Sequence, residues 1–177
     1  MGNLKIIVDH ETIEYSGPVN MKDLFRHIDA FSKEKGFDFK QEKDFEHHTE
    51  EGIQIEWQGA PWKKITDYAQ YMWKIRVLGH NMHKVDVLQD KKKIKVEEGK
   101  IEIVIDAFLL TDYDSYWDTR PIFQFIRTMY DKFIYKAYTE NFEQRLVHDT
   151  NTLTHSIKQL LNFYKHYTVL SRPTQLQ

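Results

Sequence analysis

The last third of the chain contains neither glycine nor proline between Pro121 and Pro173. Roughly 45 residues there could form one helix, about 70 Å long at a rise of about 1.5 Å per residue. A domain built from the preceding ~120 residues would have a radius of gyration of about 14 Å, so we expect such a helix to extend beyond it. No other part of the sequence constrains the fold as strongly.

Successive residues of an α-helix are about 100° apart, and this spacing gives the segment two apolar stripes on roughly opposite sides. The first stripe contains Ile122, Phe123, Ile126, Met129, Tyr130, Phe133, Ile134 and Ala137. The second stripe contains Tyr135, Phe142, Leu146, Leu153, Ile157, Leu160 and Tyr164. The first is predicted to cover the chain's own domain. The second has the seven-residue and mixed three- and four-residue spacings of a coiled-coil seam, and it is predicted to contact another chain.

Two interpretations of this helix remain open. The helix is either straight, with its distal half paired with a second copy, or broken at residues 148–152 and folded back. These are poor helix formers, and Asn151 or Thr152 could cap a new helix at Leu153. Because the second stripe keeps its phase across residues 149–152, we expect a continuous helix and a homodimer.

The preceding residues show strand and helix patterns in turn. Leu4, Ile6 and Val8 are apolar residues at every second position, and this spacing predicts a first strand. Asn20 is a suitable N-cap for an amphipathic helix that ends before Gly36. Beyond it, alternation with a period of two predicts about six more strands, over residues 39–46, 53–58, 71–77, 83–88, 93–96 and 99–110.

Composition narrows the class of protein. A chain of 177 residues, 41% of them apolar and 29% charged, fits one globular domain. Its net charge of -2 gives no general attraction to nucleic acid. The absence of cysteine excludes disulfides and thiolate metal sites and favours a reducing cytoplasm. No stretch approaches the ~20 apolar residues of a membrane span. We therefore expect a cytoplasmic protein without a nucleic-acid partner.

Two histidine clusters and one aspartate group are the candidates for chemistry. They are His47 and His48, His80 and His83, and Asp112, Asp114 and Asp118. Adjacent histidines on a strand point to opposite faces, the second pair lies in a predicted turn, and the aspartates fit the start of the long helix. No hydrolase, phosphate-loop or zinc-protease motif occurs. We predict no catalytic residue, no cofactor and no metal site.

The order of strand, helix, six antiparallel strands and long C-terminal helix resembles that of the START-like, helix-grip (SRPBCC-type) superfamily over about residues 4–147. The resemblance is in element order, without a sequence motif. It implies an α+β fold in which a curved antiparallel sheet of about six or seven strands wraps around the long C-terminal helix, with one amphipathic helix after the first strand. Residues 1–147 would form this domain, and residues 148–177 would be a helical extension with a short disordered tail.

Members of that superfamily mostly bind apolar or amphipathic small molecules, so the resemblance implies non-catalytic binding in a cavity between sheet and helix. The cavity would be lined by Phe45, Ile55, Trp57, Tyr71, Trp73, Ile75, Met129 and Phe133. The same residues also fit a solid core. The alternative is an assembly or protein-interaction module with a filled interior, which homodimerises through the distal helix and uses the outer sheet face near Val104, Phe108 and Leu110. A third alternative is a cyclase- or hydrolase-like enzyme.

Overall fold

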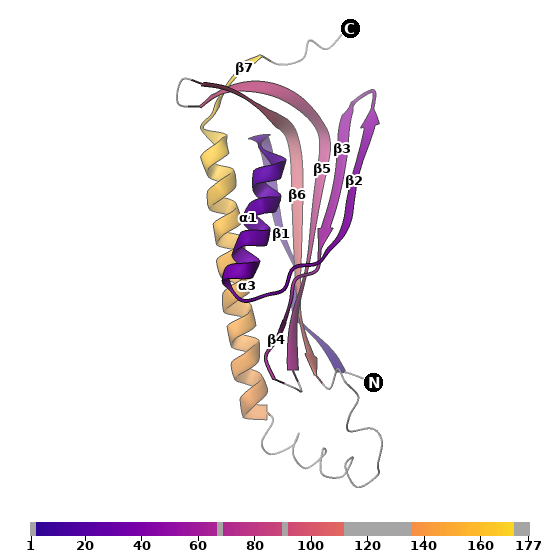
Figure 1. Cartoon of the computed structure of the whole chain (residues 1–177), viewed down its shortest axis with the longest axis vertical. Coiled ribbons are helices and arrows are strands. Elements are labelled where there is room, and N and C mark those ends of the chain that lie inside the picture. Colours follow the sequence, from indigo (N-terminus) through magenta and orange to yellow (C-terminus); the bar gives the residue numbers. More distant parts are fainter. Residues whose placement is uncertain (1–2, 67–68, 90–91, 112–135, 172–177) are drawn as a thin grey trace.

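The structure, a computed structural model, describes residues 3–66, 69–89, 92–111 and 136–171. The elements follow in the order β1 (Asn3–Val19), α1 (Met21–Glu34), β2 (Gln41–Thr49), β3 (Gly52–Gly59), β4 (Trp62–Lys64), β5 (Ala69–Gln89), β6 (Lys92–Thr111), α3 (Lys136–Lys165) and β7 (Thr168–Ser171). The described strands form one 7-stranded sheet in the order β1-β6-β5-β3-β2, with β4 and β7 both paired with β5. The sheet is curved and open, and both helices lie on one side of it (Figure 1). The predicted α+β fold is confirmed.

Helix α1 is built as its sequence predicts. The Asn20 side chain accepts hydrogen bonds from the backbone N–H groups of Lys22 (3.1 Å) and Asp23 (3.3 Å). Gly36, with φ of 77°, follows the last turn in the left-handed conformation that glycine tolerates. The helix buries Met21, Leu24, Ile28 and Ser32. The Phe25 ring stacks on Trp57 of β3 with centroids 4.8 Å apart, which fixes α1 against the sheet.

Strands β5 and β6 are each one long strand, where the sequence predicts two. The predicted turn at residues 80–83 is a bulge inside β5, with the register shifted between His80 and His83 and Asn81 at φ of 51°. Met82 is fully buried beside Gly79 and Gly99. A Cβ atom on Gly99 would lie 2.8 Å from the backbone oxygen of His80, which cannot move aside as a side chain can, so the bulge requires glycine on the neighbouring strand.

Helix α3 runs without a break from Lys136 to Lys165, so the prediction that the helix continues through residues 148–152 is confirmed. The prediction that the second stripe faces away from the domain is wrong. Leu146, Leu153, Ile157 and Tyr164 are at most 4% exposed and belong to the main core. Phe142 and Leu160 pack against that core, and Tyr135 and residues 122–134 of the first stripe lie outside the described residues.

The length of the strands explains this difference. Strands β5 and β6 contain 21 and 20 residues, a contour length of roughly 65–70 Å at about 3.3 Å per residue. The 30 residues of α3 span about 45 Å. The sheet is therefore longer than the described helix, which lies along it instead of extending past a compact domain. Core residues occur on both sides of the predicted domain boundary at residue 147, as Leu146 and Leu153 show.

Candidate functional site

The predicted cavity lining is largely brought together on the face of the sheet that carries the helices. Ile55, Trp57, Tyr71, Trp73 and Ile75 all project from β3 and β5 into the main core and are at most 6% exposed. Their alternation along the two strands placed them on one face, as expected.

Protein groups satisfy the polar atoms of this inner face. Trp73 Nε1 donates a hydrogen bond to Thr150 Oγ1 (2.9 Å), which itself donates to the backbone oxygen of Leu146. Tyr71 donates to the backbone oxygen of Phe142 (2.7 Å), and burial, partly opposed by Arg145, raises the pKa of this phenol to about 12. The Phe37 ring stacks on Trp73 with centroids 4.0 Å apart. The described inner face is thus packed with rings and linked to α3 by hydrogen bonds.

Phe45 does not belong to this face, so its prediction as a cavity residue is wrong. It pairs with Glu56, which places it on the opposite side of the sheet from Ile55 and Trp57, and it is 52% exposed. The register shift between Gln41 and Lys43 breaks the alternation that links Phe45 to Phe39, which still contacts Trp57. The other two predicted residues, Met129 and Phe133, lie outside the described residues.

The opposite, outer face of the sheet carries a band of apolar side chains. Strand register aligns one residue from each of β1, β6, β5 and β4 in a single row, and the next pair of β1 and β6 residues extends it. This outer apolar row consists of Ile6, Phe108, Met72 and Trp62, with Leu4 and Leu110 beside them. Leu4 is 50%, Ile6 54% and Trp62 36% exposed. A hollow of about 350 Å³ adjoins Trp62 and Met72.

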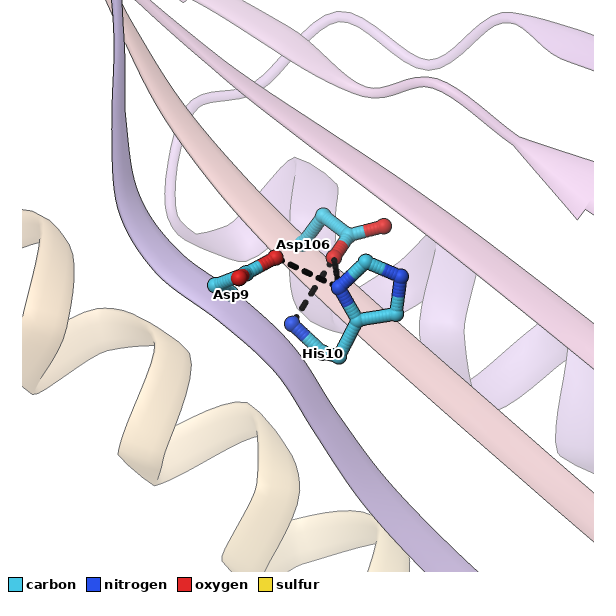
Figure 2. A group of neighbouring side chains, drawn as sticks. All are labelled: Asp9, His10 and Asp106. Atoms are coloured by element: carbon cyan, nitrogen blue, oxygen red, sulfur yellow. Dashed lines mark hydrogen bonds and ion pairs between the residues drawn. The ribbon is translucent and has the colours of Figure 1, made fainter.

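A polar cluster borders this row where β1 is irregular. The register of β1 against β6 shifts between Val8 and Glu11, and His10 has a φ of 53°. Its backbone N–H donates to Asp106 Oδ1 (2.9 Å), while its ring Nδ1 lies 3.3 Å from Asp106 Oδ1 and 2.5 Å from Asp9 Oδ1 (Figure 2). We call Asp9, His10 and Asp106 the bulge cluster.

Asp106 is the buried member of the bulge cluster, with a side chain only 7% exposed. Its Oδ2 atom lies 3.5 Å from Arg76 Nη2, a contact at the long limit of a hydrogen bond. Arg76 Nε is also buried, and no hydrogen-bond partner for it is found in the described part of the chain. The carboxylate is therefore contacted by the backbone N–H and the ring Nδ1 of His10 and by one distant guanidinium group.

Sequence patterns did not predict the bulge cluster. In a regular strand Asp9 and His10 would point to opposite faces, so their convergence depends on the bulge. The available signal was Asp106, the one charged residue in the otherwise apolar run of residues 103–110.

Comparison with known proteins identified no relative. No family model matches the chain, and no curated protein or solved structure resembles it significantly. The fold defines an α+β protein with a large antiparallel sheet and a C-terminal helix packed on it, a layout compatible with the helix-grip arrangement. Neither described helix has the length and apolar character needed to cross a membrane.

Proposed function

We propose that this protein is an assembly module in which two copies associate through the outer apolar row. The observation that carries the proposal is an apolar band on the outer face of a sheet whose described inner face is already packed. Contiguous apolar patches of more than a few hundred Å² are uncommon on monomers and usually mark an interaction site. Burying such surface stabilises association by about 25 cal/mol per Å² before the entropic cost of binding is subtracted.

The charges around the row support a second copy as the partner. Lys64 lies on β4 and Lys74 on β5, where Lys74 is opposite Asp106 of β6 in the strand register, and Asp9 lies farther along on β1. A two-fold axis parallel to the strands would place β4 and β5 of one copy, which carry these lysines, over β1 and β6 of the other, which carry the carboxylates. Such self-complementarity is required of an interface between identical chains. The two sheets would pack face to face about 10 Å apart.

Light scattering coupled to size-exclusion chromatography tests the proposal. At micromolar concentration we expect twice the mass of one chain. The change Ile6→Glu should raise the dissociation constant of the dimer at least about tenfold, because it would bury an unpaired charge. The matched control is Leu88→Glu, at a residue that is 42% exposed but lies outside the row, and it should remain dimeric. A wild-type chain that stays monomeric would refute the proposal.

Binding of an apolar or amphipathic small molecule between sheet and helix is a second proposal. The layout compatible with the helix-grip arrangement favours it, and two predicted lining residues, Met129 and Phe133, lie outside the described residues. Native mass spectrometry of the purified protein separates the two proposals, since it reports both subunit number and any retained molecule. A bare chain that also fails to bind a long-chain fatty acid probe would contradict small-molecule binding.

A further inference from the structure

The bulge cluster offers three metal-ligating groups that converge on one point. Its ligand atoms, two carboxylate oxygens and one imidazole nitrogen, all lie within 4.8 Å of one another. They come from a strand bulge and from the neighbouring strand, so the sheet backbone sets their positions. We propose that Asp9 Oδ1, His10 Nδ1 and Asp106 Oδ1 bind a divalent transition-metal ion. The inference uses two carboxylates that also border the proposed interface, and its test measures metal binding instead of subunit number.

The distances between the ligand atoms fit such an ion if the Asp9 carboxylate moves slightly. Metal–ligand distances of about 2.0–2.2 Å in a tetrahedral site place neighbouring ligand atoms about 3.3–3.6 Å apart. His10 Nδ1 and Asp106 Oδ1 are already 3.3 Å apart. Asp9 Oδ1 is 2.5 Å from the same nitrogen and would move outward by about 1 Å. The Asp9 side chain is 68% exposed, so surrounding atoms do not block this movement.

The charges of the cluster favour a cation. In the described part of the chain, the buried Asp106 carboxylate contacts His10 Nδ1 (3.3 Å) through Oδ1 and Arg76 Nη2 (3.5 Å) through its other oxygen, Oδ2. Oδ1 therefore faces His10 and Asp9 and is free of the guanidinium group. Asp9 adds a second carboxylate beside it. Burying a carboxylate is costly, Asp106 has a guanidinium group only at the long distance of 3.5 Å, and an ion placed between the two carboxylates would reduce that cost.

The donor set also predicts selectivity. Imidazole nitrogen suits zinc and other late first-row ions, whereas magnesium and calcium prefer sites made of oxygen alone. Three protein ligands leave coordination positions for water. We therefore expect binding of Zn²⁺ and Co²⁺ in preference to Mg²⁺. Because the chain has no cysteine, no thiolate competes for the ion.

Isothermal titration of the metal-free full-length chain with Zn²⁺, and the visible absorption of bound Co²⁺, test the proposal. We expect one site, with the affinity lowered at least about tenfold by His10→Gly and by Asp106→Asn. Glycine adopts the positive φ of His10 without strain, so His10→Gly removes the ligand and preserves the bulge even if Asp106→Asn fails to fold. His48→Ala, an exposed histidine on β2, is the control for the other histidines of the chain and should leave the affinity unchanged. Absence of a single Zn²⁺ site, or equal affinity in His10→Gly, would overturn the inference.

Discussion

Buried tyrosine hydroxyl groups connect residues that are distant in the sequence. Tyr164 on α3 donates a hydrogen bond to Asp23 Oδ2 on α1 (2.8 Å), and Tyr71 on β5 donates to the backbone of α3. Burial is the main reason that the pKa of Tyr164 is raised well above its ordinary value of 10.0, and the hydrogen bond to Asp23 raises it further. Burial, with a smaller contribution from Glu98, likewise raises the pKa of Tyr15 to about 12. Each group is a hydrogen-bond donor only while it is protonated.

Stability should therefore decrease in strongly alkaline solution. Tyrosines in the unfolded chain ionise near pH 10, whereas the folded protein keeps these three protonated to higher pH. Their contribution is therefore complete below about pH 10 and is lost progressively above it, by about pH 12 for Tyr15 and Tyr71 and at higher pH for Tyr164. We expect the melting temperature to fall above about pH 10, and to fall less steeply in Tyr164→Phe, which has no proton to lose there. Thermal denaturation followed by circular dichroism measures both. Identical slopes in the variant and the wild type would contradict the assignment to Tyr164.

At the scale of elements, α3 is continuous because tertiary contacts compensate for poor helix formers in its middle. Asp149 forms an ion pair with Lys35 (3.3 Å). The hydroxyl groups of Thr150 and Thr152 donate to backbone oxygens four residues earlier. Thr150 is fully buried because the Trp73 indole requires a hydrogen-bond acceptor at this point. Propensity alone would disfavour these residues in a helix interior.

Two substitutions at the exposed residue Asn151 distinguish a continuous helix from one that begins there. In a continuous helix Asn151→Pro removes an internal hydrogen bond and should lower the free energy of unfolding by about 3 kcal/mol or more. Asn151→Ala should be neutral or stabilising by about 0.5 kcal/mol, since alanine is the better helix former. Urea denaturation provides the values. If Asn151 were instead an N-cap, the alanine variant would lose about 1 kcal/mol.

At the scale of the whole molecule, the sheet is unevenly supported. Strand β6 lies between β1 and β5, and the five consecutive residues 103–107 of its distal half are buried. Strand β2 is at the edge, pairs only with β3 within the described sheet, and has all nine residues exposed. In Figure 1, β2 lies at the edge of the sheet farthest from α3. Strand β2 therefore depends on backbone pairing with β3 more than on buried side chains.

Hydrogen exchange should follow this difference. We expect backbone amides in residues 41–49 to exchange at least about tenfold faster than those in residues 101–109, because separation of β2 from β3 exposes little apolar surface. Mass spectrometry of peptides after deuterium labelling makes the comparison within one sample. Equal protection of the two segments would indicate that β2 has a partner on its free edge.

The sequence by itself determined the features that depend on neighbouring residues. Asn20 and Gly36 define the limits of α1 through local hydrogen bonds and backbone conformation, and Tyr71, Trp73 and Ile75 share a face because a strand alternates. The α+β class followed from these local periods. Each of these properties is set within a few residues of chain, so a single sequence is sufficient to predict it.

Tertiary structure alone decided which surface each apolar side chain meets. Bulges reverse the alternation, so Phe45 faces outward and Asp9 and His10 converge on Asp106, which lies 96 residues beyond His10. Leu146 and Leu153 belong to an apolar stripe that had to be buried against some surface. The paired strands are long enough for the chain's own sheet to provide that surface. Periodicity identifies side chains that must leave water, but the partner depends on strand pairing between distant segments.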